Sequence, residues 1–184
     1  MLSKISLDKY SLTDTNCLLF DTNILINLFY PLMNTNSYMR EYQLLWGKIL
    51  KSNKKLILPA IQISEFINRC IRFQYALYKS NTSNELDFKK DYRNTEDYRE
   101  NMKQILDIVK NDILTHFSVI NDDFNNIDPE KLYIYGFSYD FNDAMLVGIA
   151  ENNNADIITH DSDFANYNTK INLVSSNHAL LMFS

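Results

Sequence analysis

Apolar residues along the chain fall into two kinds of pattern, short continuous runs and longer stretches with helical spacing. The short runs, such as CLLF before Asp21, are bounded by polar residues, which is typical of buried strands. We predict strands at residues 17–21, 55–59, 118–120, 156–160 and 171–176. Asp21 therefore stands at the C-terminal end of the first predicted strand.

The longer stretches repeat apolar residues at every third or fourth position, as amphipathic helices do. The strongest repeat runs from Tyr98 to Phe117, and another follows Pro59 as far as Tyr78. A first helix is predicted to open at Thr22 or Asn23 and to be stopped by Pro31. Further helices are predicted at about 37–51, 60–78 and 98–117, with a last one from Ser138 or Asp140 to residue 154. Strands and helices alternate, which predicts an α/β fold around a mainly parallel sheet.

The length of 184 residues suits one folding unit spanning residues 1–184. Within it, the stretch at about residues 79–100 is polar and weakly periodic, and it is predicted to be a helical or loop insertion. Functional groups of parallel sheets gather at the carboxyl ends of the strands. Because Asp21 and Asp161 both follow predicted strands, we expect a site where those strand ends meet.

Composition excludes several classes of protein. Hydrophobic residues make up 46% of the chain, yet no apolar run approaches the roughly 20 residues that span a bilayer. The N-terminal segment also lacks an apolar leader, so we expect a cytoplasmic protein with no membrane partner. Cys17 and Cys70 lie in apolar segments without a CxxC or Cys/His pattern, which predicts buried thiols rather than a disulfide or zinc site.

Charge is unevenly distributed along the chain. Residues 1–111 carry 16 Lys and Arg against 12 Asp and Glu, whereas residues 112–184 carry 2 against 11. A basic part beside an acidic part is what a phosphate-tracking surface next to a carboxylate site would produce, with Arg69 and Arg72 as nucleic-acid-binding candidates. Ordinary sorting of solvated surface charge explains the same imbalance.

Four acidic residues have distinctive sequence contexts. Asp21 lies in LLFDTN, Glu65 follows PAIQIS, Asp143 lies in FNDAMLVGIA, and Asp161 lies in IITHDSDF. In this order they resemble the acidic signature of the PIN-domain nucleases, the family that includes the VapC-type toxins of bacterial toxin–antitoxin pairs. The four elements span residues 17–164, and their joint occurrence is more specific than any one of them.

The resemblance implies a PIN-like three-layer α/β/α fold and an endoribonuclease that uses Mg²⁺ or Mn²⁺. It assigns the catalytic and metal-binding roles to Asp21, Glu65, Asp143 and Asp161. Asn23 and Thr159 match positions that orient the acids. Asp163 and Asp140 are further candidates for orienting the acids or binding a second ion, and Asp163 matches the family's trailing acid.

The physical chemistry of such a cluster agrees with the resemblance. Converging carboxylates repel one another, so without a cation at least one of them should have a raised pKa. Mg²⁺ and Mn²⁺ prefer oxygen ligands, and such an ion activates water to attack phosphorus. We therefore expect hydrolysis of RNA phosphodiester bonds, with products that the family resemblance implies to carry a 5′ phosphate.

Each acid also has a simpler interpretation. Asp21 and Asp140 are good helix N-caps, and Asp143 could complete a capping arrangement with Asp140. Glu65 could pair with Arg69 across one helical turn. Asp161 and Asp163 could be turn formers. His160 lies beside the predicted site and is interpreted as a substrate-facing or solvent residue rather than a ligand.

Three other functions compete with the ribonuclease. A degenerate PIN domain would bind RNA or a protein without cutting, and a non-enzymatic α/β module would make the acids a coincidence. A haloacid-dehalogenase-like phosphatase needs a second aspartate two residues after Asp21, where Asn23 stands. RNA is the expected substrate, and an antitoxin protein and a second copy of the chain are candidate partners. The polar stretch at 79–100 makes the chain longer than the family's compact toxins, which puts a toxin role in the narrow sense in doubt against that of a defence or processing nuclease.

Overall fold

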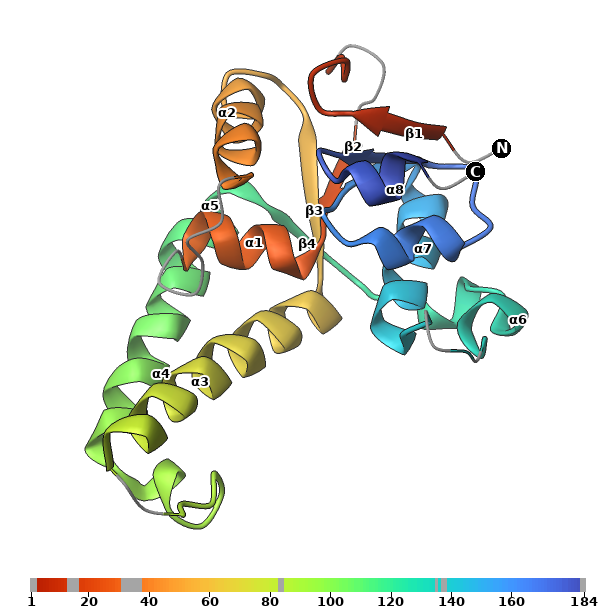
Figure 1. The fold of residues 1–184 in the computed structure, drawn as a ribbon. Coiled ribbons are helices and arrows are strands. Elements are labelled where there is room, and N and C mark those ends of the chain that lie inside the picture. The colour runs from red at the N-terminus through yellow and green to blue at the C-terminus, as the bar shows by residue number, and fades with distance from the viewer. Residues whose placement is uncertain are drawn as a thin grey trace.

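The computed structural model describes residues 3–12, 17–30, 38–82, 85–134, 136 and 139–182. Its centre is a six-stranded sheet in the order β1-β6-β5-β2-β3-β4, with every neighbouring pair parallel (Figure 1). The strands are β1 (Ser3–Ser6), β2 (Cys17–Phe20), β3 (Lys55–Pro59), β4 (Ser118–Ile120), β5 (Ala155–Ile158) and β6 (Asn172–Ser175). The predicted α/β class with a mainly parallel sheet is confirmed.

Helices cover both faces of this sheet. The main ones are α1 (Thr22–Phe29), α2 (Met39–Ile49), α3 (Ala60–Thr82), α4 (Glu96–Ile108), α6 (Pro129–Leu132), α7 (Phe141–Asn153) and α8 (His178–Met182). A π-helical segment, η3 (Val109–Ile113), and α5 (Leu114–His116) continue α4, and short 3₁₀ turns are η2 (Tyr92–Asn94), η4 (Phe124–Asn126) and η5 (Ser162–Asn166). No helix among the described residues is both long and apolar enough to cross a membrane.

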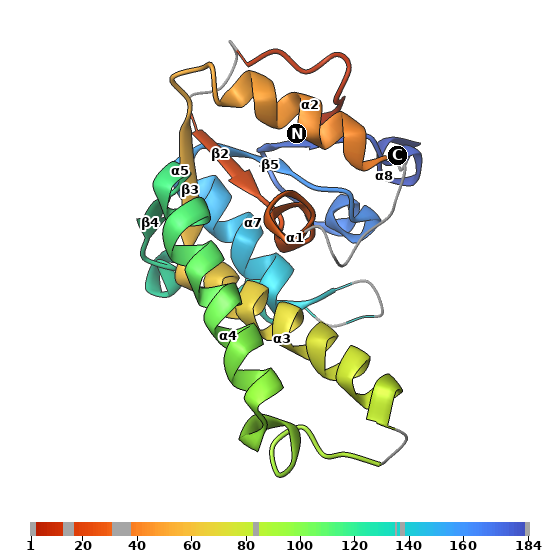
Figure 2. The same cartoon turned by 90° about the vertical axis from the view of Figure 1, so that its left-hand side faces the viewer.

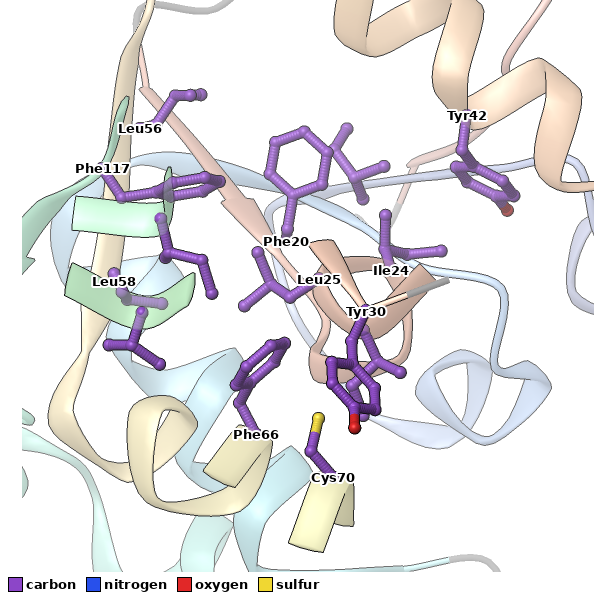
Figure 3. Close-up of a cluster of buried hydrophobic side chains, with 14 of the residues drawn as sticks. Phe20, Ile24, Leu25, Tyr30, Tyr42, Leu56, Leu58, Phe66, Cys70 and Phe117 are labelled. Carbon is purple, nitrogen blue, oxygen red and sulfur yellow. The ribbon is translucent and has the colours of Figure 1, made fainter. Parts of the chain in front are cut away.

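Alternating strand residues divide the core into two layers. Leu18 and Phe20 of β2 pack on one face, whereas Cys17 and Leu19 pack on the other. This period of two is the geometry of a strand buried on both faces. Figure 3 shows part of the first layer, in which Phe20 lies among side chains from α1, β3, α3 and α5–β4. The second layer contains α7, η5 and α8, so the architecture is α/β/α.

Helices α3 and α4 form an arm that leaves the sheet and returns to it. Figures 1 and 2 both show the two helices side by side, projecting beyond the rest of the molecule. The polar stretch predicted at 79–100 falls at the far end of this arm. Although this stretch is polar, one of its described residues, Tyr92, is fully buried. Four aromatic rings surround it: Tyr75, Tyr78, Phe88 and Tyr98.

The predicted strands all occur, and the long helical repeat from Tyr98 to Phe117 is confirmed as α4, η3 and α5. Strand β1 and helix α8 were not predicted. Pro31 and Ser138, proposed as a helix stop and a helix start, lie outside the described residues. Both cysteines are buried, as expected.

The sheet order identifies where a site can form. From β2 the chain moves outward through β3 to β4, then returns on the other side of β2 through β5 and β6. The segments after β2 and β5 pack on opposite faces, α1 in the first layer and η5 in the second. Such a switch point opens a crevice at the carboxyl ends of the two strands. Asp21 and Thr159 are the first residues beyond those ends.

Candidate metal-binding carboxylate site

Asp21 is held in place at the end of the central strand. Its backbone N–H donates to the Ile158 carbonyl at 2.9 Å, continuing the pairing of β2 with β5. The Thr159 hydroxyl donates to Asp21 Oδ2 at 2.9 Å, and the Asn23 amide nitrogen lies 3.3 Å from the same oxygen. Thr159 and Asn23 thus contact Asp21 as the resemblance implied. Asp21 also caps α1 by accepting from the Asn23 backbone N–H, so the capping interpretation is confirmed.

Glu65 reaches the same region from the first turns of α3. The Thr22 hydroxyl donates to Glu65 Oε2 at 2.9 Å, and Arg69 Nη1 lies 3.4 Å from Oε1. One turn earlier, the buried Gln62 amide donates to the carbonyl of Phe20, which ties α3 to the end of β2. Sequence reasoning missed Thr22 and Gln62. The position of Thr22 between Asp21 and Asn23 was the available signal.

Asp143 has the least compensated charge of the group. It is half-buried in the first turn of α7, and no described residue donates a hydrogen bond or an ion pair to its carboxylate. Burial, with the nearby charges of Asp21, Asp140, Asp161 and Glu65, raises the pKa of Asp143 to about 8. The predicted raised pKa is therefore confirmed, and the cause shows that these acids lie close enough to repel one another.

Asp21 titrates abnormally for related reasons. Burial raises its pKa to about 6, although the hydrogen bonds from Thr159 and Asn23 oppose the rise, and the charges of Asp161 and Glu65 add to it. A carboxyl group with only 4% of its surface exposed pays a large desolvation penalty when it ionises. A nearby cation would remove that penalty for both Asp21 and Asp143.

The three remaining acids lie at helix and turn starts. Asp161 receives its position from Thr159, whose hydroxyl accepts the Asp161 N–H at 2.9 Å, and it caps η5 through the Asp163 N–H. Burial and the charge of Asp161 raise the pKa of Asp163. Asp140 is exposed and caps α7 by accepting from the Asn142 N–H at 2.8 Å. Asp140 is thus coupled to Asp143, whose pKa its charge raises, whereas Asp163 is coupled to Asp161.

A polar cleft of about 340 Å³ opens beside these acids. Asn23, Arg69 and Asp161 line it, together with Tyr38, His160 and Asn177. A larger cavity of about 450 Å³ lies between α2, α8 and the end of β1 and contains none of the predicted site residues. Of the two proposed basic residues, only Arg69 lines the cleft, because the Arg72 guanidinium lies 3.8 Å from the centre of the Phe88 ring on the arm.

The donor set fits a hard divalent cation by its chemistry. Asp21, Glu65, Asp143 and Asp161 offer only carboxylate oxygens, and their mutual repulsion leaves charge for a cation to neutralise. Among the described residues, no three acidic, histidine or cysteine side chains form a ligand cage by themselves. An ion such as Mg²⁺ commonly takes one or two carboxylates and completes its shell with water and phosphate oxygens, which suits so open an arrangement.

A family model and a solved structure match this chain. The family model described as PIN domain matches residues 18–170. A crystal structure of VapBC2 from Rickettsia felis, bound to a DNA fragment from their promoter, is similar at 18% sequence identity with a TM-score of 0.47, covering 86% of this chain and 98% of that chain. A comparison with curated proteins found no significant match. Because the family model spans the sheet from β2 to β5 and all four predicted acids, the chain belongs to the PIN-domain family.

Proposed function

We propose that this chain is a metal-dependent endoribonuclease. PIN domains are typically nucleases that use divalent metals, and the carboxylates at the switch point carry the chemistry that such an enzyme needs. The observation that supports the proposal best is Asp143. Its pKa of about 8 and its lack of a donor among the described residues mark a carboxylate that the fold itself does not compensate.

Asp21, Glu65, Asp143 and Asp161 would hold Mg²⁺ or Mn²⁺. When bound, the ion supplies Lewis-acid assistance to hydrolysis of the phosphodiester bond. Two threonine hydroxyls of the chain would orient these carboxylates, because Thr159 donates to Asp21 and Thr22 donates to Glu65. Such orienting contacts are the usual partners of ligating carboxylates.

Other residues would bind the RNA. Arg69 is a cation on the wall of the cleft and suits a phosphate oxygen, although Glu65 lies within ion-pair distance of it. Arg72, stacked on Phe88, would contribute to phosphate binding only along the arm. A strand that enters the cleft would thus bring its backbone phosphates to Arg69 and Asp161, which both line it.

Two narrower partner assignments rest on the family resemblance alone. One is an antitoxin protein, which would make the chain the toxin of a toxin–antitoxin pair, and the other is a second copy of the chain. The competing proposal is a degenerate PIN domain that binds RNA or protein without cutting. Retention of all four acids, with raised pKa values at Asp21 and Asp143, favours the nuclease.

The direct test is incubation of the purified chain with mixed single-stranded RNAs in Mn²⁺, in Mg²⁺ and in EDTA. We expect cleavage with either metal, none in EDTA, and products with a 5′ phosphate. Asp21→Asn should abolish cleavage. Asp128→Asn is a matched control, because Asp128 caps α6 as Asp21 caps α1 but is not among the site acids. RNA binding without metal-dependent cleavage by the wild-type chain would support the degenerate PIN domain instead.

A further inference from the structure

Two aromatic rings lie flat against each other on the wall of the polar cleft. The Tyr38 and His160 rings are nearly parallel, with an interplanar angle of 5° and centroids 3.6 Å apart. Tyr38 precedes α2, and His160 stands between Thr159 and Asp161 beyond β5. The ring pair therefore adjoins the carboxylate site, since both sequence neighbours of His160 belong to that site. The proposed hydrolysis does not use the ring pair.

The histidine is held by a hydrogen-bond network. The Tyr42 hydroxyl donates to the Thr159 carbonyl at 2.8 Å, accepts from the Ser176 N–H at 3.1 Å, and lies 3.0 Å from His160 Nδ1. In the tautomer in which Nδ1 donates to the Tyr42 oxygen, Nε2 of the neutral ring is an acceptor. The Asn177 amide also donates to the His160 carbonyl at 2.6 Å. These contacts fix both the backbone and the ring of His160.

The rest of the cleft wall is rich in groups that recognise nucleobases. Asn23 and Ser162 bring an amide and a hydroxyl group, and Arg69 brings a cation, whereas Asn27 is buried and its amide donates to the Asn23 carbonyl at 2.8 Å. At about 340 Å³ the cleft is within the size range of small-molecule pockets, so it suits one nucleotide and not a duplex. Aromatic rings, an imidazole acceptor and side-chain amides beside a phosphate-binding cation form a set that matches a single unstacked base.

We infer that the Tyr38–His160 pair forms a nucleobase-binding subsite, which holds one base of a single-stranded RNA next to the phosphodiester bound by the carboxylates. The inference rests on the proposed ribonuclease function. The ring pair supplies stacking surface, and His160 Nε2 accepts from a base N–H. Asp161, which lines the same cleft, links this subsite to the carboxylates.

The test is an abasic scan. The affinity of the wild-type chain is measured for a short single-stranded RNA and for versions in which one base at a time is replaced by an abasic ribose. Ca²⁺ is present, and each strand is checked for integrity. We expect one position at which removal of the base weakens binding about tenfold, the scale of one base–aromatic stack. In Tyr38→Ala, binding of the intact strand should fall by a similar factor, and the abasic step should vanish.

Two further variants separate the subsite from a folding effect. Tyr38→Phe keeps the ring and should retain the abasic step, whereas Tyr38→Leu fills the volume without a ring and should lose it. Tyr133→Ala removes an aromatic side chain that is 66% exposed and lies outside the cleft, and it should behave as wild type. A flat scan for the wild-type chain, or a step that persists in both Tyr38→Ala and Tyr38→Leu, would overturn the subsite.

Cleavage in Mn²⁺ is scored separately on the same wild-type preparation. A chain that cuts RNA but gives a flat scan would keep the ribonuclease and lose the subsite. A chain that shows the Tyr38-dependent step but never cuts would keep the base-binding subsite and lose the ribonuclease.

Discussion

Carboxylates in two regions of this protein lie in opposite electrostatic surroundings. At the tip of the arm, Asp87 accepts the backbone N–H groups of Lys89 and Lys90, which hold its pKa below the usual value. On α4, Asp97 accepts from the hydroxyl of the buried Tyr92 at 2.8 Å. At the carboxyl ends of the strands, burial and like charges raise the pKa values of Asp21 and Asp143.

The difference distinguishes carboxylates that stabilise the fold from carboxylates that destabilise it in the absence of a cation. The arm carboxylates are satisfied by donors within the chain, so they stabilise the arm as they are. The site carboxylates oppose one another, so their ionisation costs folding free energy until a cation arrives. Sequence position alone does not distinguish the two groups, whereas the donors and charges around each carboxylate do.

The largest expected effect is on catalysis. Asp143→Asn should lower RNA cleavage in Mn²⁺ by orders of magnitude, because a ligating carboxylate is lost. Asp97→Asn should cut at nearly the wild-type rate, because its amide oxygen can still accept from Tyr92. Cleavage rates per folded molecule measure both. An Asp143→Asn variant that cuts normally would remove Asp143 from the site and leave Asp140 to replace it.

The next effect is on the pH dependence of stability. The pKa of Asp143 rises from 3.8 to about 8 on folding, so between these values the folded chain binds more protons than the unfolded chain. The free energy of unfolding in EDTA should therefore fall as pH rises from about 4 to 8, by at most about 1.4 kcal/mol per pH unit for this group.

Denaturant unfolding at several pH values measures that slope. Asp143→Asn should remove the slope between about pH 6 and 8, because Asp21, with a pKa of about 6, contributes only at lower pH, and it should unfold no more easily than wild type near pH 7. Asp97→Asn should keep the wild-type slope. If Asp143→Asn were less stable than wild type at pH 7 while keeping the slope, capping would be the better account of this residue.

The smallest effect concerns the two basic residues, which lie in different surroundings. Arg69→Gln should weaken RNA binding modestly and reduce its salt slope by about one, as expected for one lost phosphate contact. Arg72→Gln should leave the salt slope nearly unchanged, because Arg72 is stacked on Phe88. Titrations of RNA at several salt concentrations would show this. Equal changes in the two variants would contradict the separate roles.

The sequence allowed the sheet and the acids of the site to be predicted for identifiable reasons. Strands buried on both faces appear as short apolar runs, and Asp21 directly follows β2, while Asp161 lies shortly beyond the end of β5. The helical repeat after Pro59 placed Glu65 on α3, and the motif FNDAMLVGIA placed Asp143 in the first turn of α7. The local sequence pattern was sufficient to predict a site residue wherever a single strand or helix determined its position.

Prediction was incomplete where contacts join distant segments. Strand β1 is four residues long and contains Ser and Lys, so no apolar run marked it. Tyr92 is buried only because aromatic residues from α3 and α4 surround it, although its own segment is polar. Thr22 contacts Glu65 across 43 residues of sequence, and Tyr42 contacts His160 across 118. The spacing of residues within one segment does not predict such long-range contacts.

Calorimetric titration of Mn²⁺ tests most directly the claim that the site carboxylates bind a metal ion. The protons released on binding report how far Asp143 is protonated in the metal-free chain. At pH 7, Asp143 with a pKa of about 8 is largely protonated in the metal-free chain, and ligation requires the carboxylate. Titrations in two buffers of different ionisation enthalpy should therefore show release of about one proton per ion. Asp143→Asn should bind Mn²⁺ more weakly and release fewer protons. Binding of Mn²⁺ to the wild-type chain with no proton release, or with the same release in Asp143→Asn, would contradict the account.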